Sequence, residues 1–233
     1  MSDLNQDEIR AQNIKAMGVR CGELYSDLYK EILWLHVVWR QYRVLFGTSA
    51  ARIELENKTA GFFFVLLNDT LWDSVLLHIC RLTDPPVVGR RSKKQTLTLL
   101  RLAGEIPEPA VSKRVRSLVG RAKTAATFAR DWRDRRIAHR NLELVQSLSA
   151  PPLKPGSRSN VEGVLALFRD ILSAMEHHYL NHEQVTFDYA SPGNDAEALL
   201  YQLRLARMIQ DERDARLRAG EPRPEDFLHP PEI

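Results

Sequence analysis

The sequence predicts an all-α protein, and three observations support this fold class. Apolar residues recur at intervals of three and four along most of the 233 residues, which is the spacing of one face of an α-helix. No stretch shows the sustained alternation of apolar and polar residues that is typical of a β-strand. The composition, 44% hydrophobic and 27% charged, is that of a globular chain with a substantial core. We therefore expect a bundle of about five to six helices.

Two long antiparallel helices are expected first. The earlier one ends at Gly47, and its apolar stripe consists of Leu24, Leu28, Ile32, Leu35, Trp39, Tyr42 and Phe46. Ser49 can cap the next helix, whose stripe consists of Phe63, Leu67, Leu71, Val75 and Leu82. That helix must end near Asp84, because Pro85 and Pro86 lack the N–H donor and restrict the residue before them.

Several side chains in these two helices are expected to be structural. His36 and His78 lie inside apolar patterns and are expected to be packed and hydrogen-bonded. Trp34 and Trp39 are expected to be in the core rather than to form a platform for nucleobases. The spacing of Arg81 and Asp84 is typical of a local ion pair.

A later helix begins near Pro109, after a short helix over 97–103 that Thr96 can cap. Its apolar stripe consists of Val115, Leu118, Ala122, Ala125, Ala129 and Trp132. Continued by the same step, the stripe reaches Arg136 and His139. The packed face of this helix thus becomes cationic over its last turns, which favours a polar pocket at a helix interface.

The remainder of the chain is expected to form the last helix of the bundle, a helical extension and a tail. Residues 147–160 are rich in Pro and Ser and are expected to be a flexible surface connection. A helix then runs from Val161 towards Leu180, and Asn194–Glu197 has a capping-box pattern that opens another. We predict a helical bundle over 1–182, a helical extension packed on it over 183–219, and a Pro-rich, extended tail over 220–233.

Positive charge is concentrated in one part of the chain. The net charge is only +3, yet residues 90–140 contain 15 Lys or Arg against 4 Asp or Glu. Clustered cations favour a polyanion such as nucleic acid, or an acidic protein surface, because they release its counterions on binding. The alternative is an ordinary solvated helix face.

The chain shows no feature of a secreted or membrane-spanning protein. Its longest unbroken apolar run, Phe62–Leu67, is far shorter than the roughly 20 residues of a membrane-spanning helix. The segment 1–8 is polar and acidic, unlike a secretion signal. We expect a cytoplasmic protein without a membrane partner. Cys21 and Cys80 are isolated in helical patterns and are expected to be core thiols.

No cofactor is expected. His178 and His182 stand one helical turn apart, as two metal ligands can, but no matching third ligand is evident. We favour an exposed helix end for this segment and expect no metal.

The segment Arg133–Asn141 is the candidate site, because it surrounds one histidine, His139, with arginines. Imidazole has an unperturbed pKa near neutrality and can transfer protons. Guanidinium groups bind phosphate oxygens and stabilise negative charge that develops on them. This combination is suited to phosphate chemistry.

Two segments resemble a known family. Arg133 and His139, with five residues between them and polar Asp134 after the arginine, resemble the Arg-x4-6-His motif of HEPN domains, which are small α-helical bundles. Leu71–Ser74 and Ile79–Asp84 resemble the second-helix signature of the AbiU-like abortive-infection branch. The resemblance covers residues 20–182.

The resemblance implies a metal-independent ribonuclease, used as a toxin or in phage defence, that cleaves cellular RNA. His139 would act as general acid or base, and Arg133 would stabilise the phosphorane. In the family two such motifs commonly meet across a homodimer to form a composite site, and an antitoxin can restrain the activity. We assign supporting roles to Asp134, Arg136, Asp73 and Arg81, and RNA binding to Arg130, Arg135 and Arg140.

Helix geometry leaves the partner of His139 open. Six residues at 100° each place Arg133 about 120° away from it around an unbroken α-helix. Either the helix unwinds or ends near Ile137, or a partner subunit supplies the arginine, or Arg136 takes the role. We favour Arg133, with Arg136 second.

Other functions also fit the sequence. One is a non-catalytic HEPN module that binds RNA or a nucleotide through the basic segment. Another is a structural helical dimer whose basic face meets an acidic protein. In a purely structural interpretation, His139 stabilises a helix carboxyl end and the arginines pair with Asp131, Asp134 and Glu143.

Overall fold

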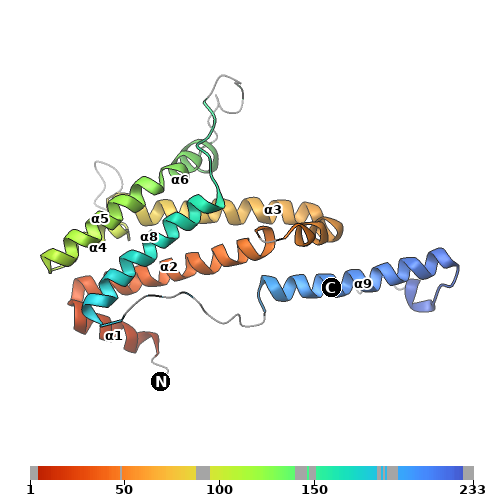
Figure 1. Cartoon of the computed structure of the whole chain (residues 1–233), viewed down its shortest axis with the longest axis horizontal. Coiled ribbons are helices and arrows are strands. Elements are labelled where there is room, and N and C mark those ends of the chain that lie inside the picture. The colour runs from red at the N-terminus through yellow and green to blue at the C-terminus, as the bar shows by residue number, and fades with distance from the viewer. Residues whose placement is uncertain are drawn as a thin grey trace. The chain divides into compact units, whose positions relative to one another are not determined.

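The computed structural model is all-α over the residues that it describes, which are 5–47, 49–87, 95–139, 146, 151–182, 185, 187 and 194–227. Its α-helices are α1 (Gln6–Met17), α2 (Val19–Phe46), α3 (Ala50–Thr83), α4 (Leu99–Glu105), α5 (Pro109–Ala125), α6 (Thr127–Trp132), α8 (Arg158–Tyr179) and α9 (Ala196–Ala219) (Figure 1). A π-helix, η1 (Arg133–Ile137), follows α6, and a 3-10 helix, η2 (Pro224–Phe227), follows α9. The predicted fold class is confirmed.

The eight α-helices of the described residues exceed the predicted number for two local reasons. Residues before α2 form α1, which Asn5 and Glu8 cap through reciprocal side chain to backbone hydrogen bonds. Gly18 ends α1 with a φ of 79°, a backbone conformation that favours glycine. The helix predicted from Pro109 onwards is divided at Ala126, whose ψ of 6° lies outside the helical range.

The chain divides into two compact units. Unit 1 comprises residues 1–39 and 70–188, and unit 2 comprises residues 40–69 and 189–233. Residues 40–69 therefore group with the C-terminal helix, although a single bundle was predicted over 1–182.

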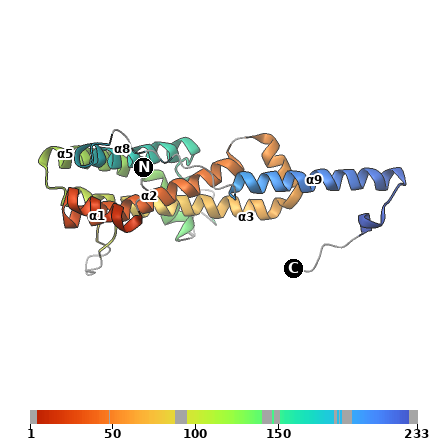
Figure 2. The ribbon, with the colours of Figure 1, turned by 90° about the horizontal axis from the view of Figure 1, so that it is seen from below.

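In unit 1, α2 and α3 run antiparallel, as predicted. The rings of Trp39 and Trp72 are 6.3 Å apart, while Glu31, earlier in α2, contacts His78, later in α3. Helix α5 packs along α8, and Figures 1 and 2 both show these two helices side by side. The largest fully buried side chains include Tyr25, Leu28, Ile32, Leu35, Leu76, Ile79, Phe168, Ile171 and Leu172.

The two cysteines are buried free thiols in this core, as predicted. Burial raises the pKa of Cys21 and of Cys80 to about 11. Both thiols therefore stay protonated, and neither is an activated nucleophile at neutral pH.

Unit 2 contains α9, which begins where the capping pattern predicts. The Asp195 side chain accepts hydrogen bonds from two backbone N–H groups of the first turn, and Gln41 Oε1 accepts one from Ala196 N at 2.8 Å. Asp226, only 2% exposed, accepts hydrogen bonds from Arg216 and anchors η2. Residues 224–227 thus depart from the extended tail that the sequence suggested, because this buried carboxylate holds them.

Helix α3 also carries an exposed apolar surface in unit 2, which includes Phe62 and Val65. It follows Ala60, whose φ of −152° and ψ of 55° interrupt the helix.

Among the described residues, α3 is the one helix long and apolar enough to cross a membrane, with an 18-residue window of mean hydropathy 1.3 that is 22% buried. This is weak evidence, because the core helix of a globular protein passes the same test, and the absence of a membrane partner stays a prediction.

Candidate functional site

The helix that carries the candidate site changes geometry at Arg133. The backbone N–H of Ala138 donates to the carbonyl oxygen of Arg133 at 2.8 Å, across five residues rather than four, and η1 ends at Ile137. Single π-helical turns inside α-helices occur frequently at functional sites. The helical geometry thus changes before His139, as in the first of the three alternatives, so the angle of an unbroken α-helix does not apply to Arg133 and His139.

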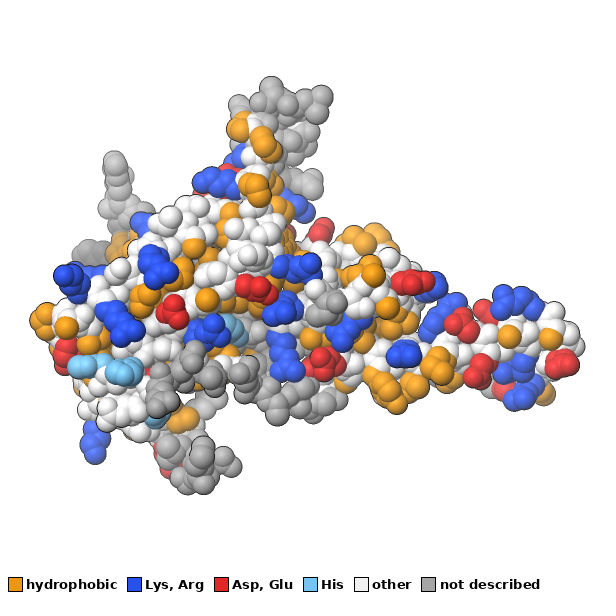
Figure 3. Space-filling view, in the orientation of Figure 1, with side chains coloured by type: hydrophobic (Ala, Val, Ile, Leu, Met, Phe, Trp, Pro, Cys, Tyr) orange, Lys and Arg blue, Asp and Glu red, His pale blue; other side chains and the backbone are white. Residues whose placement is uncertain are grey.

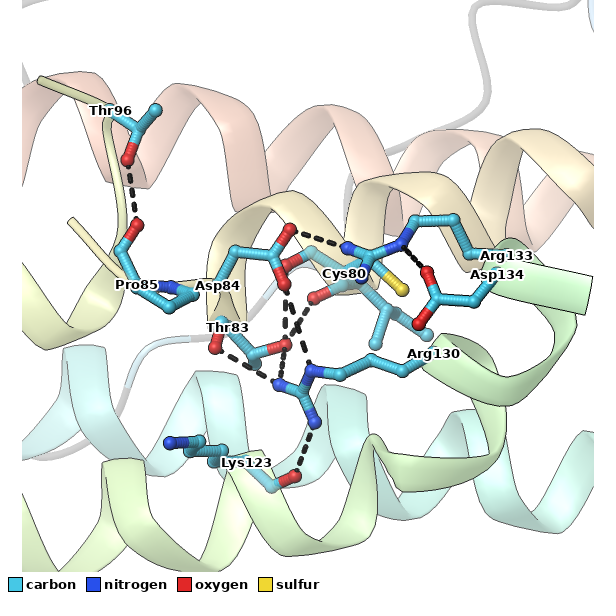
Figure 4. A network of polar contacts seen from close by, with 10 residues as sticks. Cys80, Thr83, Asp84, Pro85, Thr96, Lys123, Arg130, Arg133 and Asp134 are labelled. Carbon is cyan, nitrogen blue, oxygen red and sulfur yellow. Dashed lines mark hydrogen bonds and ion pairs between the residues drawn. The ribbon is translucent and has the colours of Figure 1, made fainter. Parts of the chain in front are cut away.

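Two carboxylates hold the Arg133 guanidinium (Figure 4). Its Nη1 donates to Asp84 Oδ2 at 2.6 Å, and its Nε donates to Asp134 Oδ1 at 2.8 Å. The hydrogen bond with Asp134 raises the pKa of Arg133 above its usual value. Nη2 has no partner among the described residues. A permanently charged, oriented guanidinium thus keeps one nitrogen for a further acceptor.

Asp84 is shared with a second arginine, Arg130. The Nε of Arg130 lies 3.6 Å from Asp84 Oδ1, and its Nη2 donates to Thr83 Oγ1 at 2.7 Å and to the Thr83 carbonyl at 3.0 Å. Its Nη1 donates to the carbonyl of Lys123 at 2.8 Å. Arg130, expected to bind RNA, is thus engaged with the end of α3 and with α5. We call Thr83, Asp84, Arg130, Arg133 and Asp134 the Asp84 network.

Asp84 and Thr83 were not singled out as site residues by the sequence. The available signal was the resemblance of Ile79–Asp84 to the family signature. A local pair of Arg81 with Asp84 was expected instead, and that expectation is wrong. In the structure Asp84 contacts Arg130 and Arg133, whereas Arg81 contacts Glu31 on α2 and His78 on α3.

His139 lies just beyond the end of η1 and is exposed. Among the described residues, no hydrogen bond or ion pair joins it to Arg133 or to any other side chain. The structure therefore presents this imidazole to solvent, six residues after the anchored arginine. Arg140, expected to bind RNA, and Glu143 lie outside the described residues.

Arg135 and Arg136 have different partners. Arg135 donates to the carbonyl oxygens of Pro151 and Pro152 and to Asp131, as the structural interpretation expected for Asp131. The Arg136 guanidinium lies 5.0 Å from the centre of the Trp132 ring.

The segment 151–157 is held against this part of unit 1. Trp132 Nε1 donates to the carbonyl of Lys154 at 2.9 Å, and Lys154 N donates to Asp131 Oδ2 at 2.8 Å. A Cβ on Gly156 would lie 3.2 Å from Trp72 and 3.3 Å from Trp132, so only a residue without a side chain fits without displacing a ring. Residues 151–157 are therefore held in place by contacts, whereas a flexible connection was predicted for this segment.

Asp73 and Arg81, expected to support the site, line a separate groove of about 650 Å³ between α2 and α3. Its walls include Glu31, Trp34, Asp73, Ser74, His78 and Arg81, which we call the Trp34 groove. Trp34 is 60% exposed, so its predicted place in the core is wrong. It directly precedes buried Leu35 and is turned about 100° away from that face of α2. Trp39 is buried, as predicted.

The Trp34 groove contains a cluster centred on Glu31 Oε2. His78 Nε2 lies 2.8 Å from this oxygen and Arg81 Nη2 lies 3.0 Å from it. Burial, only partly offset by the hydrogen bond to Glu31, lowers the pKa of His78. Arg81 Nη2 also lies 3.0 Å from His78 Nε2, so Glu31 Oε2, His78 Nε2 and Arg81 Nη2 are all in mutual contact. Glu31 Oε1 has no partner among the described residues.

Part of the predicted charge asymmetry lies on α5. This helix carries five cations and no acidic residue, and all five are exposed: Lys113, Arg114, Arg116, Arg121 and Lys123. By contrast, α8 and α9 both carry charges of the two signs, and Figure 3 shows Asp and Glu side chains among the Lys and Arg side chains.

The histidines at the end of α8 contact neighbouring side chains. His182 Nδ1 lies 3.3 Å from Glu176 Oε2, and His178 packs edge-on against Tyr179. Within the described ranges, no group of three or more His, Cys, Asp or Glu could hold a metal ion.

The all-α fold fits the class of HEPN-type helical proteins. The AbiU2 family model matches residues 20–200, and the chain belongs to this family of HEPN proteins. It is therefore an abortive-infection HEPN-like protein. No curated protein and no solved structure matches the chain.

Proposed function

We propose that this protein is a metal-independent endoribonuclease that cleaves cellular RNA as a toxin or phage-defence protein. The observation that carries the proposal is the anchored Arg133, whose Nη2 is without a partner among the described residues, six residues before exposed His139. Membership of the AbiU2 family supports it. The RNA 2′-hydroxyl supplies the nucleophile, so the reaction requires no metal.

The reaction uses His139 for proton transfer. The 2′-oxygen attacks phosphorus while a neutral imidazole removes its proton, and the P–O5′ bond breaks as the 5′-oxygen gains a proton. The products are a 2′,3′-cyclic phosphate and a 5′-hydroxyl. Arg133 stabilises the charge on the phosphorane through its Nη2.

The general acid and the general base must be two groups in opposite protonation states, one protonated and one neutral. One chain contributes one histidine at this site, so we propose that a second copy supplies the other across a homodimer. This composite site fits the exposure of His139. Asp84 and Arg130 act as positioning residues that orient Arg133, and the α5 cations bind the RNA backbone.

The proposed setting is the cytoplasm, where an antitoxin would restrain the enzyme. Exposed cations on α5 offer a surface that an acidic inhibitor could cover in competition with RNA.

The test is incubation of purified wild type and His139→Ala with total RNA and tRNA in chelator. We expect wild type to cleave and His139→Ala to lose at least about 100-fold of the rate, with an unchanged melting curve. His177→Ala, which removes an exposed histidine on α8, is the matched control and is expected to cleave like wild type. Equal cleavage by His139→Ala would contradict the proposal.

The second candidate is an RNA-binding module without catalysis. It is favoured by the hydrogen bonds that both Nη atoms of Arg130 and of Arg135 donate to acceptors within the chain, which is typical of a structural arrangement. Salt-sensitive RNA binding by wild type, with no cleavage in chelator or in Mg²⁺, would favour this candidate over the ribonuclease.

A further inference from the structure

The Trp34 groove contains an exposed aromatic face beside polar groups. Trp34 is 60% exposed, although burial of its ring would be favourable by its size alone. It stands one turn of α2 after Glu31, and α3 supplies the opposite wall with Asp73, Ser74 and His78. A flat ring beside acceptors is the arrangement on which proteins stack and hydrogen-bond unpaired nucleobases.

The hydrogen bonds in the groove leave an acceptor for such a base. Arg81 Nη2 donates to Glu31 Oε2 at 3.0 Å, and His78 Nε2 lies 2.8 Å from the same oxygen, so both contacts of this carboxylate are made through Oε2. Oε1 of the same carboxylate has no partner among the described residues. An oriented carboxylate oxygen accepts the exocyclic amino group of a base.

The Trp34 groove and the Asp84 network follow one another on α3. Arg81, at the end of the groove, is three residues before Asp84, which corresponds to about 4.5 Å along the helix axis and about 60° around it. The Arg81 side chain is 63% exposed and can face a phosphate while it remains near Glu31. A nucleotide in the groove would therefore be close in the strand to a phosphate at Arg133.

We propose that the Trp34 groove binds an unstacked nucleobase of single-stranded RNA, with Trp34 as the stacking face and Glu31 as the acceptor for an exocyclic amino group. The inference rests on the proposed function, because the bound strand is the RNA that is cleaved. It assigns a preference: guanine, cytosine and adenine carry such an amino group, whereas uracil does not. Trp34 and Glu31 are then specificity residues, separate from Arg133 and His139.

The test measures binding, so that it does not depend on cleavage. Fluorescence anisotropy is recorded with a labelled heptauridine, and with heptamers that carry one central guanosine, cytidine or adenosine, on full-length His139→Ala protein. We expect the three substituted strands to bind about 5-fold more tightly than heptauridine. Trp34→Ala in this background weakens all binding by about 10-fold, whereas Trp34→Phe, which still stacks, weakens it much less.

Two further variants complete the test. Glu31→Gln is expected to reduce the preference for amino-bearing bases, since an amide carries no charge to attract them. Tyr201→Ala, which removes an exposed aromatic ring on α9, is the control and leaves affinity unchanged. Unchanged affinity for Trp34→Ala with a wild-type melting curve would overturn the inference and leave the ribonuclease proposal intact. Absence of RNA binding by every variant would overturn both.

Discussion

The two polar regions on α3 use their charges in opposite ways. In the Asp84 network, one carboxylate contacts two arginines, and the donors of Arg130 end on backbone and side-chain acceptors within unit 1. In the Trp34 groove, His78 and Arg81 contact one oxygen of Glu31, and a tryptophan face stays exposed. The first arrangement is suited to holding a group in place and the second to receiving a ligand. Changes in the first should reduce the rate of cleavage, and changes in the second should reduce affinity.

The largest effect is expected from Arg133→Lys. A lysine is a point charge that cannot bond Asp84 and Asp134 while presenting a further nitrogen to phosphate. Single-turnover cleavage should slow by about 10² to 10³-fold, the range for removal of one preorganised donor. Arg218→Lys, an exposed change on α9, is the control and should have no effect. A loss confined to RNA affinity would show that Arg133 only binds the strand.

A smaller effect is expected from Asp84→Asn, which keeps the shape of the side chain and removes its charge. Loss of orientation at Arg133 should lower kcat by about 10 to 100-fold while KM changes little. The weakened contacts with Arg130 and Arg133 should also reduce the free energy of unfolding by about 1–3 kcal/mol in urea titrations. A change in KM alone would contradict a positioning role for Asp84.

The histidines of unit 1 predict a loss of stability in acid. Burial, with a smaller contribution from Arg169, lowers the pKa of His36 to about 4, and burial also lowers the pKa of His78. Between the unfolded pKa of about 6.5 and the lowered folded pKa, the unfolded chain binds more protons than the folded chain. The free energy of unfolding therefore falls as the pH drops from about 6.5 towards 4. His36 should account for at most about 3 kcal/mol of this loss.

This pH effect can be measured by urea unfolding at pH 7.0, 6.0 and 5.0. His36→Phe, which preserves the stack on Phe187, should flatten the decline. If the free energy of unfolding falls as steeply with pH in that variant as in wild type, groups other than His36 take up the protons.

The smallest expected effect is the coupling between the two regions. If the Asp84 network affects kcat and the Trp34 groove affects affinity, Asp84→Asn and Trp34→Ala should combine additively in kcat/KM, within about 0.5 kcal/mol. The measurement is a double-mutant cycle with a guanosine-containing RNA. A coupling well above that value would show that the groove and the network act as one site.

Local sequence patterns predicted much of the fold. The buried stripe of α2 and the end of α3 at the prolines follow from spacing and backbone chemistry, which act within a few residues. The start of α9 at Asp195 follows in the same way. Helix α1 was missed although Asn5 and Glu8 have the capping-box spacing.

Contacts between distant residues account for what the sequence could not predict. Asp84 and Arg133 are 49 positions apart, so no local pattern pairs them, and the nearer Arg81 was a plausible but wrong partner for Asp84. The π-helical turn at Arg133 has no compositional signature. Trp34 is apolar in type yet exposed, because its angle on α2 differs by one residue from the buried stripe. Arg133 and His139 as the candidate pair came from the resemblance to the family motif, and their roles stay a prediction.

The central claim is that the RNA itself supplies the nucleophile to a site built around Arg133 and His139. The most direct measurement uses one end-labelled RNA, in chelator, with and without a single 2′-deoxy substitution at the cleaved nucleotide. We predict that wild type leaves a 2′,3′-cyclic phosphate and a 5′-hydroxyl on the unmodified strand and does not cut the substituted one. Cleavage of the 2′-deoxy strand at the same position, or a 5′-phosphate on the product, would contradict the account.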